Sequence, residues 1–402
     1  MSRSVEHETH DVTGLVDSLL EQGLAAGATD LHFEPTDDGL LVRVRVDGQL
    51  IDYQSVPLRL ANNVITRLKV LASLLTYRVD IPQEGSLQWR GDETAQQDSA
   101  IDLRIATFPT IRGERAVVRV FAGVSGLQSL DMLGFTEEQS ATLTRAVARP
   151  AGLIVVTGPA GSGKTTTLYA LIRHLTLHHA QRSVITLEDP VEQRIDRVTQ
   201  VQINPHGELD YERCMRSLLR QDPEVILLGE VRDARTARIA LEAALTGHLI
   251  LTTLHSADPA ETVVRFLDMG IAPYQVVSAL TNVCAQRLLR ETCRACGGTT
   301  RSSCPKCLGT GYAGRTAVAQ LVCMDEPARR LILQHPTTSQ LRERFKQQGP
   351  DLAERARRMV VNGLTDEAEL TRVLGVDSEA EVGNGKQRDD SIGTCDGERT
   401  VG

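Results

Sequence analysis

The sequence predicts an α/β protein whose main domain is a parallel sheet, preceded by a small α+β domain. The chain has 402 residues, and its 41% hydrophobic content is enough for two or three domains with buried cores. Short apolar runs at residues 153–156, 184–187, 225–228 and 249–254 are separated by longer helical segments, which is typical of a parallel sheet. Before them, residues 41–46 alternate between apolar and basic side chains, as a half-buried strand does.

The small domain is expected at residues 13–123, after a flexible arm at residues 1–12. Apolar residues at helical spacing predict one helix starting near Val12 and another near Leu60. Further strands are expected at residues 101–105 and 116–121, and a polar, exposed loop is expected at residues 91–99. Residues 124–149 are interpreted as a linker and a leading helix.

A glycine-rich turn follows the first apolar run of the main domain. Residues 158–165 match the pattern G-x-x-x-x-G-K-[ST] at every fixed position, between a predicted strand and a predicted helix. Its backbone N–H groups can converge on a phosphate, Lys164 can reach the β- and γ-phosphates, and the Thr165 hydroxyl can bind Mg²⁺. The pattern predicts a nucleoside triphosphate site made of Gly158, Pro159, Ala160, Gly161, Ser162, Gly163, Lys164, Thr165 and Thr166.

Two acidic residues follow strands of the same predicted sheet. Glu188 ends the run at residues 184–187, and Glu230 follows the run at residues 225–228. Because the carboxyl ends of parallel strands meet at one edge, both acids should face the bound phosphates. A carboxylate there can support Mg²⁺ or orient the attacking water. The sequence leaves the two tasks open, and Glu188 is our first choice for the water.

Two histidines bracket the run at residues 249–254. His248 precedes it and His255 follows it, so one imidazole lies at each end of a strand. A neutral histidine can donate a hydrogen bond to a phosphate oxygen or respond to its loss. Both are therefore candidate catalytic residues, and the alternative is that both are structural.

Four cysteines form two closely spaced pairs, Cys293-x2-Cys296 and Cys304-x2-Cys307. Four thiolates at this spacing suit tetrahedral Zn²⁺, and a site filled by four protein ligands is structural because it leaves no position for water. The alternative is four unligated thiols. The other cysteines lack such partners and are interpreted as ordinary thiols.

The charge and the termini exclude several classes of protein. The formal net charge is −8, and residues 377–402 contain seven acids and three bases, so nucleic acid is an unlikely partner. No run approaches the roughly 18 apolar residues of a membrane span, and the N-terminus is too polar for a signal peptide. These features predict a cytoplasmic protein.

With these motifs in place, the sequence resembles the ATPases of type II secretion and type IV pilus assembly, from about residue 13 to residue 375. The shared segments of the main domain are residues 165–169, the acidic box at 188–192, the second acidic strand within 218–233, the histidine box at 246–255, Gln-Arg-Leu at 286–288 and Gly-Tyr-x-Gly-Arg at 311–315. In the small domain they are residues 30–35 and 101–104. So many motifs in one order are highly specific.

The resemblance implies a RecA-like P-loop ATPase core at residues 150–290, a zinc-binding module at 291–315, a helical C-terminal region at 316–375 and a disordered tail at 376–402. It implies ATP, Mg²⁺ and Zn²⁺ as ligands, and a homo-oligomeric ring, a hexamer, at the cytoplasmic face of the inner membrane. Partners would hold the ring there, and it would drive pilin-like subunits through an inner-membrane platform protein. Relatives usually carry a further N-terminal domain, whereas this sequence starts almost directly at the small domain.

Arg104 and Arg119 lie on predicted strands of the small domain, where alternation turns them away from the apolar face. They can be solvated surface residues. In ring ATPases of this kind, however, a positive side chain completes the site, and arginine binds phosphate with two hydrogen bonds. We therefore expect Arg104, and second Arg119, to approach the nucleotide held by Lys164.

Other functions remain as alternatives at this point. A RecA-like nucleic-acid motor would share the core, but the acidic charge and 3% aromatic residues offer few contacts for nucleic acid. A DNA-uptake pseudopilus ATPase would share every motif. The intact phosphate loop and both acids argue against a catalytically silent scaffold.

Overall fold

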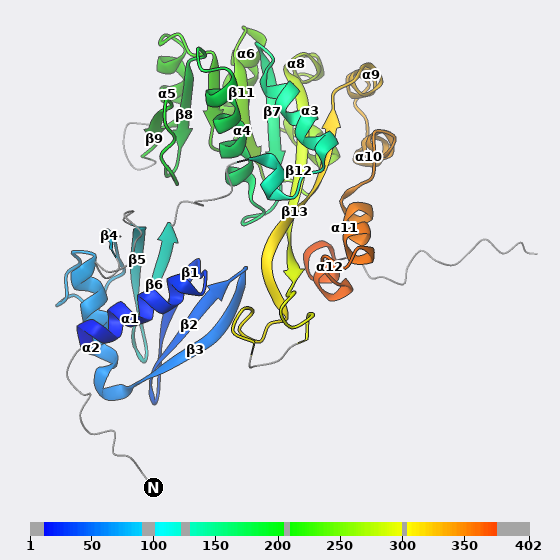
Figure 1. Ribbon diagram of the computed structural model, residues 1–402. Helices are drawn as coiled ribbons and strands as arrows, with labels where there is room; N and C mark the ends of the chain where they lie inside the picture. The colour runs from blue at the N-terminus through cyan, green and yellow to red at the C-terminus, as the bar shows by residue number, and fades with distance from the viewer. Residues whose placement is uncertain (1–11, 91–100, 122–128, 205–209, 300–303, 376–402) are drawn as a thin grey trace, which may run out of the picture.

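The computed structural model describes residues 12–90, 101–121, 129–204, 210–299 and 304–375, which form two sheets and their helices (Figure 1). The expected arm before residue 12, the loop at residues 91–99, the linker at 123–126 and the tail at 376–402 lie outside these residues. Within the described part, no helix combines the length and the hydropathy of a membrane span.

The small domain is an antiparallel sheet covered by two helices on one face. Its strand order is β3-β2-β1-β6-β5-β4. The strands are β1 (Asp30–Thr36), β2 (Gly39–Val46), β3 (Gln49–Pro57), β4 (Gln83–Trp89), β5 (Ile101–Thr110) and β6 (Gly113–Phe121). Helices α1 (Val12–Ala25) and α2 (Leu58–Leu71) bury apolar stripes against this sheet, with Leu19 and Leu68 packed around Phe33. Both predicted helices are confirmed, and β1, β3 and β4 are additions to the prediction.

The main domain contains a seven-stranded sheet in the order β13-β12-β7-β11-β10-β8-β9. Its strands are β7 (Gly152–Thr157), β8 (Val184–Glu188), β9 (Thr199–Gln202), β10 (Val225–Leu228), β11 (Leu249–Leu254), β12 (Leu280–Thr292) and β13 (Tyr312–Cys323). Every neighbouring pair is parallel except β12 and β13. The predicted parallel α/β sheet is confirmed, and the order brings the carboxyl ends of β7, β8, β10 and β11 to one edge.

Helices cover both faces of this sheet because its strands are apolar on both sides. One face packs against the short 3-10 helix η1 (Leu130–Leu133), α3 (Glu137–Val147) and α4 (Lys164–His178). The other face packs against α5 (Tyr211–Leu218), α6 (Ala234–Leu245), α7 (Pro259–Asp268), α8 (Pro273–Ala279), α9 (Glu326–Leu333) and α10 (Thr338–Lys346). Consecutive residues such as Leu153 and Ile154 therefore belong to different cores.

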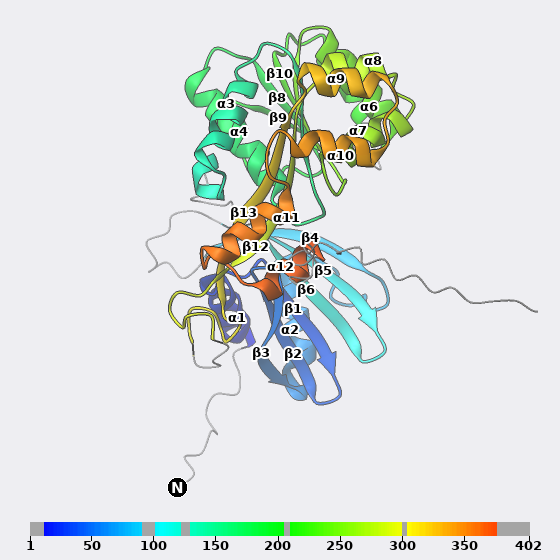
Figure 2. The ribbon, with the colours of Figure 1, turned by 90° about the vertical axis from the view of Figure 1, so that its right-hand side faces the viewer.

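The C-terminal region is only partly the helical segment that the sequence predicted. Its first residues, up to Cys323, belong to β13, and helices begin only afterwards with α9, α10, α11 (Leu352–Val361) and α12 (Glu367–Leu374). The error arises because β13 is stabilised by its ladder with β12, a contact that local spacing does not reveal. Strands β12 and β13 form a long hairpin that extends from the main sheet toward the small domain, with α11 and α12 beside it (Figures 1 and 2).

Candidate active site and cysteine cluster

The phosphate loop is braced from the side by β12. A Cβ atom on Gly158, where φ is +151°, would lie 2.4 Å from the backbone oxygen of Gln286, so only glycine fits this approach. The buried Gln286 side chain donates to the Ser162 backbone oxygen at 2.9 Å and accepts from the Thr167 hydroxyl at 2.8 Å. These contacts hold the loop in place where α4 begins.

The loop presents positive charge and a free hydroxyl group. The Lys164 ammonium donates to the backbone oxygens of Gly158 and Pro159, both at 2.9 Å. Burial lowers the pKa of Lys164, whereas the nearby charge of Glu230 raises it. Within the described residues, the buried Ser162 hydroxyl has no hydrogen-bond partner. With the N-terminus of α4 directly behind them, these groups fit a bound phosphate.

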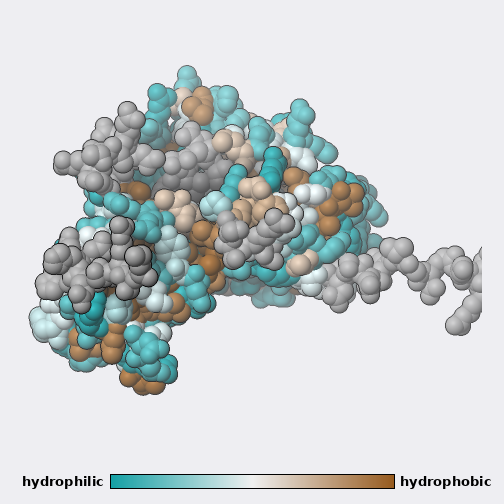
Figure 3. Space-filling view, turned by 60° about the horizontal axis from the view of Figure 1, so that its bottom comes forward, coloured by the Kyte–Doolittle hydropathy of each residue, from teal (hydrophilic) through white to brown (hydrophobic). Residues whose placement is uncertain are grey.

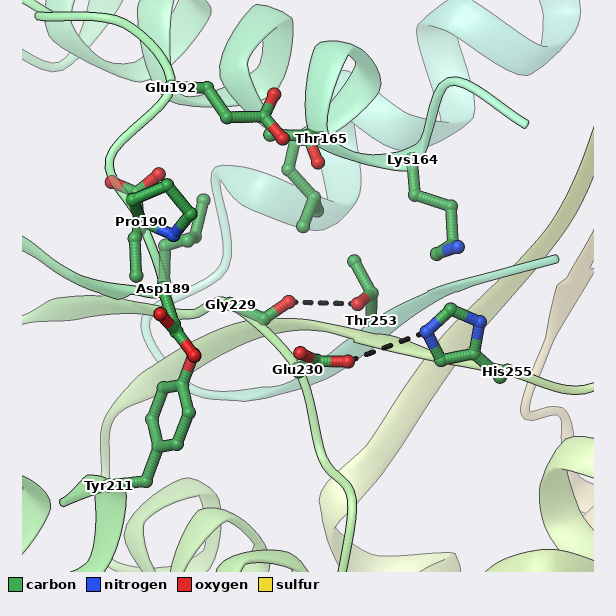
Figure 4. A pocket seen from close by; sticks show the side chains of 13 residues that line it. Lys164, Thr165, Asp189, Pro190, Glu192, Tyr211, Gly229, Glu230, Thr253 and His255 are labelled. Atoms are coloured by element: carbon green, nitrogen blue, oxygen red, sulfur yellow. Dashed lines mark hydrogen bonds and ion pairs between the residues drawn. The ribbon is translucent and has the colours of Figure 1, made fainter. Parts of the chain in front are cut away.

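A cavity beside the loop collects the predicted side chains at the carboxyl edge of the sheet (Figure 4). It is lined by Lys164, Thr165, Leu168, Glu188, Asp189, Pro190, Glu192, Tyr211, Leu227, Gly229, Glu230, Thr253 and His255. The His255 Nε2 atom lies 3.4 Å from a Glu230 carboxylate oxygen, and Arg232 pairs with the same glutamate. The other predicted loop residues, 158–163 and Thr166, do not line this cavity.

Glu188 is more enclosed than its predicted role requires. Its side chain is buried, one carboxylate oxygen accepts from the Thr186 hydroxyl at 2.5 Å and from Gln200 at 3.2 Å, and the other accepts from the Tyr169 hydroxyl. Three protein donors hold this carboxylate in place, and Glu188 also lines the cavity. The choice of Glu188 for the attacking water stays a prediction.

Glu192 is a site residue that sequence reasoning left out. The Glu192 and Thr165 side chains line the same cavity (Figure 4), so the acid faces the position expected for Mg²⁺. Burial is the main cause that raises the pKa of Glu192, the charge of Glu188 adds to it, and Thr165 and Arg119 oppose it. The available signal was its position in the acidic box, four residues after Glu188.

His248 lies at the opposite end of β11 from His255. A strand of six residues spans about 20 Å, which puts His248 out of reach of the phosphate loop of its own chain. The ring contacts the Ala243 backbone oxygen at 3.0 Å and lines a different cavity with residues that include Arg182 and Asp222. The structure thus separates the two histidines, and it does not support the predicted catalytic role of His248.

Arg104 and Arg119 are cross-strand neighbours on the face of the small sheet that α1 and α2 leave open. Arg119 pairs with Asp30 at 3.0 Å, and its charge still lowers the pKa of Glu192. Arg104 stacks on Phe121 at 4.8 Å and has no ion-pair partner among the described residues. Neither arginine lines the cavity.

The four cysteines converge as their spacing predicted. Their sulfur atoms all lie within 4.8 Å of one another, with Cys293 to Cys304 at 4.0 Å and Cys296 to Cys307 at 3.7 Å. Four sulfurs around one Zn²⁺ at bond lengths of about 2.3 Å would lie about 3.8 Å apart. The cluster therefore fits a tetrahedral zinc ion once its wider sulfur pairs close by up to about 1 Å.

The cysteine module also contacts the small domain of its own chain. Leu308, next to Cys307, packs against the small-domain core. The Asp47 carboxylate in the β2–β3 turn accepts from the Gly314 backbone N–H at 2.7 Å and pairs with Arg315 at 3.1 Å. The module thus sits between the hairpin of the main sheet and the small domain.

Comparisons with known proteins agree with this geometry. A family model described as Type II/IV secretion system protein matches residues 5–372. The type II secretion system protein HxcR of Pseudomonas aeruginosa is 38% identical over 368 residues, covering 90% of this chain and 77% of that protein. The type IV pilus assembly ATPase PilB of the same species is 34% identical over 395 residues, covering 92% of this chain and 69% of that protein.

A solved structure shows that the fold is shared as well. The ATPase DotB of Legionella pneumophila has a TM-score of 0.71 at 21% identity, over 92% of this chain and 97% of that chain. Together with the site geometry and the sequence matches, these findings confirm the resemblance noted above. The chain belongs to the Type II/IV secretion system protein family and is one of its ATPases.

Proposed function

We propose that this chain hydrolyses MgATP at the cavity beside Lys164 and uses the energy to assemble pilin-like subunits. The observation that carries the proposal is the meeting of Lys164, Thr165, Glu192, Glu230 and His255 at one sheet edge. Lys164 leaves the backbone oxygens of the loop and binds the β- and γ-phosphates. Thr165 binds Mg²⁺ when the ion is present, and the ion neutralises charge that develops on the phosphates.

The three glutamates of the site have different roles, which follow from their different surroundings. Glu192, with its raised pKa and its place in the same cavity as Thr165, is the base that orients the water. Glu230, paired with Arg232 and close to His255, helps to hold Mg²⁺ near the γ-phosphate. Glu188 holds the acidic box in position through its three donors.

Loss of Lys164 tests the nucleotide site directly. We expect Lys164→Ala to weaken ATP and ADP binding by about 10- to 100-fold, because a hydrogen bond to a charged group contributes about 1.5–3 kcal/mol. Titration with a fluorescent nucleotide measures this change. Lys346→Ala, which removes an exposed lysine paired with Asp351, is the matched control. Equal affinities in both variants would refute the proposed site.

We propose that the active form is a homo-oligomeric ring of six chains on the cytoplasmic face of the inner membrane, held there by a platform protein. Apolar patches show among the hydrophilic surface of the small domain, at the lower left of Figure 3. The large apolar side chains of this domain that are more than half exposed are Leu58, Val70, Tyr77, Val79, Phe108 and Ile111. Exposed apolar surface of this kind supports association with other chains.

Stimulation of ATP turnover by candidate partners tests which machine the motor serves. The expected result is that membranes containing the platform protein stimulate ATP hydrolysis and single-stranded DNA does not. Stimulation by single-stranded DNA alone would instead favour the nucleic-acid motor. The measurement compares turnover per chain with each addition at one protein concentration.

We further propose that the cysteine cluster binds one structural Zn²⁺ per chain. Cys293→Ser or Cys307→Ser is expected to lower the Tm by several degrees and to leave nucleotide affinity unchanged, because the cluster is distant from the loop but anchors the β12–β13 hairpin to the small domain. Metal analysis and thermal unfolding measure both effects. Cys323→Ser, at an exposed thiol outside the cluster, is the control. A stable, metal-free wild-type protein would contradict the proposal.

A further inference from the structure

The hydroxyl group of Tyr169 links α4, the helix that follows the phosphate loop, to the acidic box. Tyr169 lies on α4, five residues after Lys164, and its ring is 3% exposed. Its hydroxyl donates to Glu188 and accepts from the backbone N–H groups of Glu192 at 3.2 Å and Gln193 at 3.4 Å. A phenol has one donor and two acceptor positions, so residues 188–193 use the whole hydrogen-bonding capacity of this side chain.

The same helix lies close to this segment at two further points. Thr165 lies one helical turn before Tyr169, on the same side of α4, and lines the same cavity as the Glu192 side chain. Arg173 lies one turn after Tyr169 and donates to the Gln193 side chain. Helix α4 thus bonds the Glu192 backbone through Tyr169 and presents Thr165 to the cavity that the Glu192 side chain lines.

A purely structural role does not explain the hydroxyl group. The ring belongs to the apolar core with residues such as Leu171, and phenylalanine would fill that space equally well. A buried hydroxyl costs free energy unless it is hydrogen-bonded, so its position against three polar groups is specific. Burial and the adjacent Glu188 both raise the pKa of Tyr169, so the hydroxyl keeps its proton and remains a donor.

We propose that Tyr169 is a positioning residue for ATP hydrolysis: its hydroxyl fixes Glu192 against Thr165, and so sets the distance between the water-orienting carboxylate and the Mg²⁺ position. Tyr169 itself contacts neither nucleotide nor metal. The proposal rests on the roles of Thr165 and Glu192 in the proposed function. Through this link, the helix that carries Lys164 and the loop that carries Glu192 move as one unit.

Tyr169→Phe removes only the hydroxyl group. We expect kcat to fall by about 10- to 100-fold, the usual cost of losing an outer hydrogen bond that positions the residues around a metal site, and the Mg²⁺ concentration for half-maximal turnover to rise. Nucleotide affinity should stay unchanged, since Lys164 and the loop are not touched. The measurements are kcat, KM and Mg²⁺ titrations of turnover, with a fluorescent nucleotide for affinity.

Two control variants separate this role from loss of stability. Thr186→Val removes a donor to the other oxygen of Glu188 without touching the Glu192 backbone, so it should lower the Tm and leave the Mg²⁺ dependence unchanged. Tyr274→Phe changes a tyrosine that is 63% exposed and should have no effect. If Tyr169→Phe unfolds, Arg173→Met serves instead, with a weaker shift of the Mg²⁺ dependence in the same direction.

A double-mutant cycle with Glu192→Gln decides the mechanism. If Tyr169 acts through Glu192, adding Tyr169→Phe to Glu192→Gln costs little further turnover. The inference is overturned by additive losses, by wild-type kcat and Mg²⁺ dependence in Tyr169→Phe, or by the same Mg²⁺ shift in Thr186→Val. Normal nucleotide binding by Lys164→Ala would instead overturn the proposed function, so the two failures are distinguishable.

Discussion

Replacing Arg104 with alanine is expected to lower ATP turnover by about 10³-fold or more while changing nucleotide affinity far less, because an arginine that approaches the γ-phosphate contributes mainly in the transition state. Among the described residues Arg104 has no carboxylate partner and only stacks on Phe121, so its guanidinium is available for phosphate. Arg119 must first leave Asp30, and Arg119→Ala is therefore expected to have the smaller effect.

The test of Arg104 requires an assembled ring. Wild-type turnover per chain should rise with protein concentration as chains associate, and the variant should associate normally without this rise. Light scattering establishes the assembly at each concentration. Arg112→Ala is the matched control because Arg112 lies in the same domain, is exposed and, within the described part of the chain, forms its one ion pair with Asp37 at 2.8 Å. If Arg104→Ala keeps the turnover of the wild type in fully assembled rings, Arg104 is only a surface residue.

Exchanging Glu192 or Glu230 for glutamine is expected to lower turnover by about 10²- to 10⁴-fold, the range for loss of a general base, and to preserve nucleotide binding. Glu188→Gln should lose turnover as well, but with a lower Tm. Its new amide group would face Thr186, Tyr169 and Gln200, which donate to a carboxylate in the wild type. Thermal unfolding therefore distinguishes Glu188 from the other two acids.

The pH profile adds an independent check on Glu192. A base acts when it is deprotonated, so kcat should rise as the pH rises through the pKa of Glu192. Because burial raises that pKa above the ordinary 4.5, the acid limb of the profile should lie above the range of an exposed glutamate. Glu242→Gln, at an exposed acid of α6, should keep the wild-type profile and turnover. Near-normal turnover in Glu192→Gln and Glu230→Gln would contradict the proposed division of roles.

Local spacing in the sequence was sufficient for the phosphate loop, the parallel sheet and the cysteine cluster. The glycines and Lys164 of the loop act within a single strand-to-helix turn, so their pattern specifies the backbone without distant contacts. The same holds for the cysteine pairs, whose two short knuckles meet within 15 residues of chain. The ends of β8 and β10 were also predictable, because an apolar run in a parallel sheet ends where its carboxyl edge begins.

Tertiary structure decided which of these side chains can react. Sequence placed His248 and His255 at opposite ends of one strand, but only the sheet shows that a single end carries the cavity. Glu188 and Glu192 are equivalent acids in a linear motif. Donors from α4 and β9 occupy Glu188 and leave Glu192 beside Thr165, and β13 becomes a strand only because β12 lies next to it. Hydrogen-bond partners far apart in the chain set these outcomes, so short-range patterns do not encode them.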